Sequence, residues 1–138
     1  NEHIGYHQLA MVYREMNEFQ TALFYIEREQ KVIEEAFTED TLKSSVNNYE
    51  QGYLRLKLDQ LVEAEFYMQQ SLDSALKTDD LIAQACAYRG LGEIYRKLDS
   101  SKSYDYFSHA IKLFDKAGDE IGADEVRALI VNKKSETK

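Results

Sequence analysis

The feature that most constrains the fold of this chain is a short polar segment that returns at an almost constant interval. Such segments interrupt apolar patterns at Asp40, Asp80 and Asp119, which are spaced by 40 and then 39 residues. A unit of this length cannot bury an apolar face alone and must stack on its neighbours. The interval therefore predicts a helical-repeat domain.

Within each interval, apolar residues recur at helical spacing in two successive runs. In the first interval, Leu9 and Tyr13 belong to one run, and Phe19, Ala22 and Ile26 belong to the next. The absence of proline, the 6 glycines and the charged fraction of 30% suit helices joined by short turns rather than a sandwich or barrel. We therefore predict an all-α solenoid of three helical hairpins plus a C-terminal helix, in one domain over residues 1–133. The expected parts are repeats over 2–36, 41–77 and 80–117, a closing helix over 119–133 and a frayed tail over 134–138.

The clearest motif lies in the third repeat, where one helix face carries Tyr88, Leu91, Gly92 and Tyr95. Gly92 has no side chain, so a second helix can approach its backbone there. The next run has small and aromatic residues at matching positions, namely Ser103, Phe107 and Ala110. This arrangement resembles the tetratricopeptide repeat (TPR), whose first helix reads aromatic-x2-Leu-Gly-x2-Tyr. The resemblance implies a TPR-like α-α superhelix, with second helices longer than in the usual repeat of about 34 residues.

Composition excludes several functional classes. The formal net charge of -8 disfavours direct contact with nucleic acid, because phosphates repel an anionic chain. No apolar run approaches the length of a membrane span, so we expect no membrane contact. The single cysteine, Cys86, excludes an internal disulfide and suits a reducing, cytoplasmic location.

No catalytic, cofactor or metal site is predicted. Cys86 has no histidine partner in a recognisable motif, and a small helical cysteine usually packs in the core. His3 and His7 are four residues apart and could share a metal, but no third ligand is evident. The many carboxylates fall on expected solvent faces or helix caps. We therefore expect a binding protein rather than an enzyme.

The resemblance implies that the first helix of each hairpin lines a concave groove. In the third repeat the positions facing the groove are Cys86, Arg89, Glu93, Arg96 and Lys97. In the first repeat they are Ile4, His7, Met11, Arg14 and Glu15.

The second repeat admits two registers. With Gly52 equivalent to Gly92, the groove receives Val46, Tyr49, Tyr53, Leu56 and Lys57, and the core receives Asn48, Gln51 and Arg55. In the other register, which buries Tyr49, Gly52, Tyr53 and Leu56, the groove receives Asn47, Glu50, Leu54, Lys57 and Leu58, with Asn48 at its rim. We favour the register with buried tyrosines, because three polar side chains buried without partners would cost several kcal/mol.

A basic cluster stands out against the acidic background: Arg89, Arg96 and Lys97, with Lys57 and Arg14 adjoining. In a groove it would attract a carboxylate or an acidic peptide. The alternative is that these are ordinary helix-face charges paired with Glu93 and Asp99. The candidate peptide-binding residues are Asn47, Asn48, Lys57, Arg89, Glu93 and Arg96.

The repeat interval, the long second helices and the missing prolines are similar to those of Gram-positive peptide-sensing proteins, which include Rap-type phosphatases and peptide-responsive transcription regulators. This resemblance implies a short signalling peptide bound in the concave groove. The sequence opens at Asn1 inside a helical pattern, so we expect it to be the sensor part of a larger regulator. The alternative is a scaffold that binds a partner protein or forms a homodimer through exposed array ends.

Overall fold

The structure, a computed structural model, describes the backbone over residues 2–36 and 41–136 and the side chains over residues 5–36 and 41–131. Within these ranges the chain is made of α-helices and short turns, without a strand. The helices are α1 (Glu2–Glu15), α2 (Phe19–Ala36), α3 (Thr41–Lys57), α4 (Leu61–Ala75), α5 (Leu81–Lys97), α6 (Lys102–Lys116) and α7 (Glu120–Glu136).

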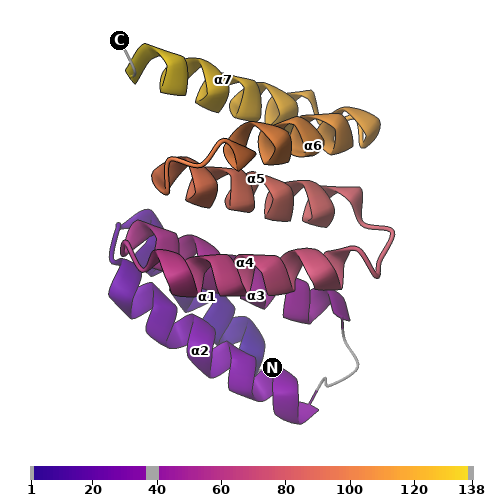
Figure 1. Ribbon diagram of the computed structural model, residues 1–138. Helices are drawn as coiled ribbons and strands as arrows, with labels where there is room; N and C mark the ends of the chain where they lie inside the picture. The colour runs from indigo at the N-terminus through magenta and orange to yellow at the C-terminus, as the bar shows by residue number, and fades with distance from the viewer. Residues whose placement is uncertain (1, 37–40, 137–138) are drawn as a thin grey trace.

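The helices pack as successive hairpins. Helix α1 packs chiefly on α2, α3 on α4, and α5 on α6. Neighbouring hairpins touch through α2 with α3 and α4 with α5, and α7 packs on α6. Figure 1 shows this stack, with the first hairpin at the bottom and α7 at the top. The predicted all-α solenoid of three hairpins and a closing helix is confirmed.

The closing helix is longer than predicted. Helix α7 continues to Glu136, past the expected end at residue 133, because neither glycine nor proline follows to interrupt it. Residues 134–136 are therefore helical rather than part of a frayed tail. The polar segment predicted around Asp40 and the last two residues of the tail lie outside the described residues.

The turn inside each hairpin uses one backbone geometry. Asn17, Asp59 and Asp99 lie in the left-handed region, with φ of 60°, 62° and 56°. In each turn the following residue donates its N–H to the helix carbonyl five positions back, as Gln60 N does to Arg55 O at 2.8 Å. This is a Schellman-type helix end, in which asparagine and aspartate tolerate positive φ better than most other side chains. The first helices of the three hairpins therefore end in the same way.

Glycine residues allow the two helices of a hairpin to approach closely. A β-carbon added at Gly52 would lie 2.9 Å from Met68 Cε and 3.2 Å from the Ala64 carbonyl oxygen of α4. A β-carbon added at Gly92 would lie 2.6 Å from the ring of Phe107 in α6. Each glycine thus faces the second helix of its own hairpin. Gly52 and Gly92, 40 residues apart, occupy equivalent positions.

The hydrophobic core follows the array instead of gathering at one centre. One cluster joins α1, α2 and α3 around Ile26 and Leu54. A second joins α3, α4 and α5 around Met68 and Leu91, and a third joins α5, α6 and α7 around Phe107. The apolar residues are thereby spread over helix stripes, and none of the described helices is long and apolar enough to cross a lipid bilayer.

The left-handed turns lead to a first prediction. Replacing Asp59→Gly removes a side chain from a positive-φ position, so the free energy of unfolding should rise by about 0.5–1 kcal/mol. The matched control is Asp73→Gly on the exposed surface of α4, where glycine should lower the free energy of unfolding by about 0.5 kcal/mol. Urea denaturation followed by circular dichroism measures both changes. A loss of stability in Asp59→Gly would contradict the proposed strain.

Candidate binding site on the face of the odd-numbered helices

Buried amides of α3 bear directly on the register of the second repeat. Asn47 is 2% exposed and Gln51 is 0% exposed. The Asn47 amide donates hydrogen bonds to Ile26 O at 2.9 Å and to Glu29 Oε1 at 2.8 Å, both in α2. Gln51 Nε2 donates to Gln30 Oε1, also in α2, at 2.7 Å. The favoured register rested on Asn48, Gln51 and Arg55 lacking partners in the core. That reason was wrong for Gln51 Nε2 and for Arg55 Nη2, which lies 3.3 Å from Glu27 Oε2 of α2, although Gln51 Oε1 and Arg55 Nε make no hydrogen bond within the described residues.

The other register, with Gly52 equivalent to Gly92, describes most of α3. Tyr49 and Tyr53 are half-buried and Lys57 is exposed, whereas the favoured register placed buried residues such as Leu54 in the groove. The register with Gly52 equivalent to Gly92 is wrong for Leu56, which it placed in the groove. Leu56 is 6% exposed and belongs to the second core cluster.

The odd-numbered helices share a face on which side chains of one helix reach the next; we call it the odd-helix face. Between α1 and α3, Arg14 Nε lies 3.5 Å from Glu50 Oε1. Between α5 and α7, Arg89 Nη1 lies 3.2 Å from Glu125 Oε1. Helices α3 and α5 are in direct contact. Charged pairs therefore connect the ends of this face to its centre.

Two tyrosines of α3 form the centre of the odd-helix face. The rings of Tyr49 and Tyr53 are stacked, with centroids 6.3 Å apart and planes inclined by 20°. Burial raises the pKa of the Tyr49 phenol above its usual 10, and the neighbouring Cys86 and Glu50 raise it further. The Tyr49 phenol therefore stays protonated. The Tyr53 ring contacts two cations, Arg14 and Lys57.

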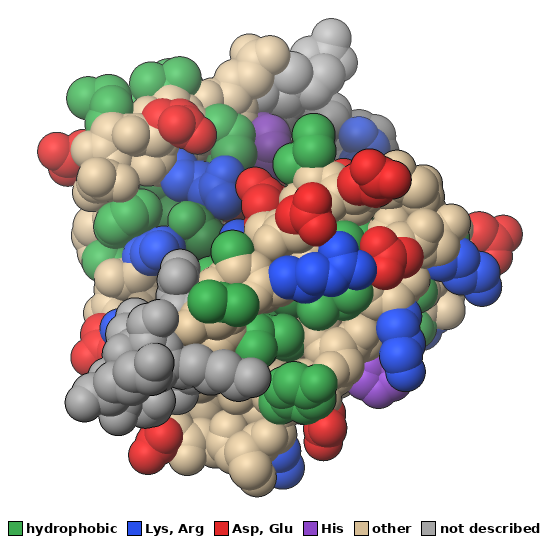
Figure 2. Space-filling view, turned by 90° about the horizontal axis from the view of Figure 1, so that it is seen from above, with side chains coloured by type: hydrophobic (Ala, Val, Ile, Leu, Met, Phe, Trp, Pro, Cys, Tyr) green, Lys and Arg blue, Asp and Glu red, His purple; other side chains and the backbone are tan. Residues whose placement is uncertain are grey.

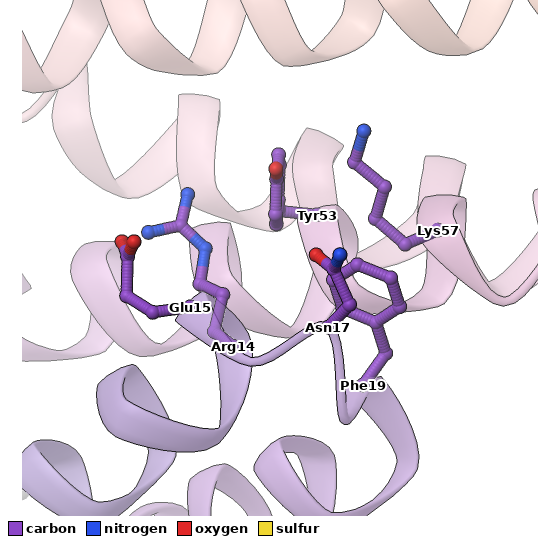
Figure 3. Close-up of a pocket in the computed structure, with 6 residues that line it drawn as sticks. All are labelled: Arg14, Glu15, Asn17, Phe19, Tyr53 and Lys57. Atoms are coloured by element: carbon purple, nitrogen blue, oxygen red, sulfur yellow. The ribbon is translucent and has the colours of Figure 1, made fainter.

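A pocket of about 230 Å³ opens beside Tyr53, where α1 and α3 end (Figure 3). Arg14 Cζ lies 4.2 Å from the Tyr53 ring centroid and Lys57 Nζ lies 5.3 Å from it. Figure 3 shows the ring edge-on, with Arg14 on one side and Lys57 on the other. Both distances suit a cation–π contact. The lining is completed by Glu15, Asn17 and Phe19.

The two cations of this pocket keep donors available for an acceptor from outside. Arg14 Nε is buried beside Glu50 and makes no hydrogen bond, and among the described residues Arg14 Nη1 donates only to the Met11 sulfur, at 3.9 Å. Lys57 makes no ion pair with the residues that the structure describes. A carboxylate entering the pocket would therefore meet two positive groups on either side of an aromatic ring.

Other members of the predicted basic cluster are held within the fold. Arg89 Nε lies 3.7 Å from Glu93 Oε2, in addition to the contact with Glu125. Burial lowers the pKa of Arg89, but the charges of these carboxylates outweigh it and the net pKa is raised. Arg96 Nη1 donates to Leu129 O at 2.7 Å, which connects α5 to α7. The alternative of ordinary paired charges thus describes Arg89.

The predicted binding residues consequently separate in space. Lys57 lies in the Tyr53 pocket, and Arg89 with Glu93 lies farther along the odd-helix face on α5. Asn47 is buried against α2 and does not line a groove. Asn48 is half-buried, and its side chain makes no hydrogen bond within the described part of the chain.

Sequence reasoning missed Tyr53 as the residue that organises the pocket. The register based on the 40-residue offset from Gly92 would have exposed Tyr53 beside Lys57. Asn17 and Phe19 were missed for another reason. They belong to the α1–α2 turn, and only the left-handed geometry of that turn brings them beside the end of α3.

A polar network joins the first three helices. His7 Nδ1 of α1 lies 3.2 Å from Glu29 Oε2 of α2, and Glu29 also accepts from Asn47 of α3. The hydrogen bond to Glu29 raises the pKa of His7 above its usual 6.5, although burial opposes this shift. Burial raises the pKa of Glu50, and the charges of Arg14 and His7 only partly offset that effect. The network therefore holds two groups that bind protons more tightly when folded.

Among the described side chains, no three His, Cys, Asp or Glu residues gather as ligands for a metal ion. The pairing of His3 with His7 considered above involves a side chain outside the described ones. Neither protein-family models nor curated proteins match this chain, so its function must be inferred from the geometry of the odd-helix face.

The His7–Glu29 contact gives a pH-dependent prediction. Because the folded chain binds the His7 proton more tightly, the stability from this contact is fully present below pH 6.5 and is lost as pH rises through the folded pKa. His7→Gln should therefore lower the free energy of unfolding by about 0.5–1 kcal/mol at pH 6 and by much less at pH 8.5. Urea titrations of both proteins at the two pH values measure the difference. His109→Gln, on exposed surface of α6, is the control. An equal effect of His7→Gln at both pH values would contradict the assignment.

Proposed function

We propose that this chain is a peptide- or protein-binding module whose odd-helix face takes an acidic or carboxylate-ended segment. The observation that carries this proposal is the placement of Arg14 and Lys57 on opposite sides of the Tyr53 ring. In a chain of net charge -8, two adjacent cations with donors left available form a local exception. Such an exception favours a ligand of opposite charge.

The chemistry of the pocket suits a carboxylate better than other anions. The Arg14 guanidinium can donate two parallel N–H bonds to the oxygens of one carboxylate, and Lys57 adds a point charge. The Tyr53 ring offers apolar surface to the methylene groups that precede the carboxylate. Glu15 at the rim would repel a doubly charged phosphate more strongly than a single carboxylate.

The size of the pocket favours one residue of a longer ligand. Sites for whole small molecules or cofactors usually enclose about 300–1,000 Å³. The volume of about 230 Å³ beside Tyr53 is below that range and suits a single acidic side chain or chain terminus. The remainder of a bound segment would lie along the odd-helix face, over Tyr49 and towards the Arg89–Glu93 pair.

The resemblance to tetratricopeptide repeats supports the same direction, since such arrays recognise extended segments on the face of their first helices. We extend the proposal accordingly to the sensor part of a larger bacterial regulator that binds a short signalling peptide. The second candidate is a scaffold that binds a partner protein or a second copy of itself. It is favoured by exposed apolar side chains on the outer side of α1, including Val12 and Met16 at 55% and 61% exposure.

Peptide titration tests the proposed anion pocket. An N-acetylated hexaglutamate peptide should shift amide resonances of the α1–α2 turn and the end of α3, and the matching hexaglutamine peptide should not. Lys57→Ala should weaken binding of hexaglutamate about 3- to 10-fold, as expected for one partly exposed charge pair. Raising the salt concentration should weaken it further.

The matched control is Lys97→Ala, because Lys97 ends α5 as Lys57 ends α3 but does not line the pocket. Arg89→Ala tests how far the bound segment extends along the odd-helix face. Equal affinity of the wild type and Lys57→Ala for hexaglutamate, or equal binding of hexaglutamine, would remove the pocket from the proposed function.

A further inference from the structure

The outer side of α1 carries an uncharged stripe that is not covered by the side chains that the structure describes. Its members are Gly5, Leu9, Val12 and Met16, and all four are exposed, with Leu9, Val12 and Met16 at 42%, 55% and 61%. Their spacings of four, three and four residues place them on one helix face. Met16 follows the last helical residue but still donates its N–H to Val12 O at 3.2 Å.

Gly5 is the residue of this stripe that the fold itself does not explain. Gly52 and Gly90 both face Met68, Gly92 faces Phe107 and Gly122 faces Phe114, so the other helical glycines of the described ranges each receive a large side chain. At Gly5 an added β-carbon would meet nothing within 4 Å. A glycine inside a helix costs about 0.5–1 kcal/mol relative to alanine. Gly5 thus lowers the stability of α1, and no close contact with a described helix offsets this loss.

We propose that a second copy of this chain covers the stripe, with the two α1 helices antiparallel about a twofold axis. In that arrangement Gly5 receives Met16 of the other copy, and Leu9 meets Val12. Both pairs share one midpoint, between residues 10 and 11, so a single axis satisfies them. Gly5 and Met16 are separated along the helix by about 16 Å. The pairing follows the rule for antiparallel coiled coils, in which a and d positions of opposite helices meet.

The charges beside the stripe are compatible with self-pairing. The twofold axis brings Gln8 near Glu15 of the other copy, where the amide can donate to the carboxylate. None of the four stripe residues is charged, so two acidic chains meet here without burying like charges. The glycine also lets the backbones approach, as glycine does inside the second and third hairpins.

The exposed face of α7, at the other end of the array, is less suited to self-pairing than the α1 stripe. The exposed stripe of α7 contains Asp124 between Ile121 and Val131, and self-pairing there would bury one carboxylate from each copy. Arg127 binds Asp124 and Asp115 at 2.8 and 2.9 Å, so this end is occupied by surface ion pairs. Figure 2, which views the molecule from the α7 end, shows acidic and basic side chains lying next to each other there. We therefore assign the second copy to the α1 stripe and not to α7.

Sedimentation equilibrium of the 138-residue chain tests the pairing. The average mass should rise from monomer to dimer with concentration between about 1 µM and 1 mM, the range expected for a small interface. Val12→Lys should weaken dimerisation by at least about 30-fold, because it buries an unpaired charge twice per dimer. Ile121→Lys on α7 is the matched control and should leave the dimer unchanged. Circular dichroism should show equal helicity for all three proteins.

A size exchange tests the specific partners. Gly5→Met should weaken the dimer about tenfold or more by steric overlap with Met16 of the other copy, although the monomer has room for the new side chain. Adding Met16→Ala to Gly5→Met should recover most of the lost affinity. A wild-type chain that remains monomeric, association beyond the dimer, or Gly5→Met and the double variant with unchanged affinity would each overturn the proposal. Lys57→Ala should dimerise normally, so the interface and the anion pocket can fail independently.

Discussion

The contact on which the rest of the structure depends is the approach of a large side chain to a helical glycine. Met68 of α4 lies against Gly52 of α3 and Gly90 of α5 and so fixes the spacing of three helices at once. In the third hairpin, Phe107 of α6 lies against Gly92 of α5 in the same way. Because a β-carbon at these positions would overlap with its neighbour, the distance between paired helices is set by the backbone. The second and third hairpins share this contact, 40 residues apart.

The interface between the first and second hairpins, α2 with α3, differs from the interface between the second and third, α4 with α5. Between α2 and α3 the buried contacts include the amides of Asn47 and Gln51, whereas between α4 and α5 the buried amide of Gln84 donates to the Ala75 carbonyl at 3.4 Å beside an apolar cluster. Buried amide N–H groups need partners, and here α2 supplies acceptors to Asn47 Nδ2 and Gln51 Nε2 from Ile26, Glu29 and Gln30. The same network continues through His7, and its charges act on Glu50, which lies 3.5 Å from Arg14 of the Tyr53 pocket.

The pocket and the α1 stripe use opposite sides of the first hairpin. Arg14 points from α1 towards Tyr53 of α3, whereas Val12 points outward, away from the described repeats. A bound segment and a second copy would therefore meet only at Glu15, which lines the pocket and would also accept from Gln8 of the other copy. The first hairpin thus concentrates the chemistry of this chain, while the third is held by internal pairs such as Arg96 with Leu129 O.

The sequence by itself determined the helical class and the hairpin boundaries. Helical periodicity and polar breaks are local properties of the chain, and the breaks recur at a nearly constant interval. It also placed Lys57 among the binding candidates. It did not determine the register of the second repeat, since whether Asn47 and Gln51 can be buried depends on partners about 20 positions earlier in α2. Only the tertiary structure decided which cations remained available. Arg14 and Arg89 have the same chemistry, but packing placed Arg89 between two carboxylates and Arg14 beside an open aromatic pocket.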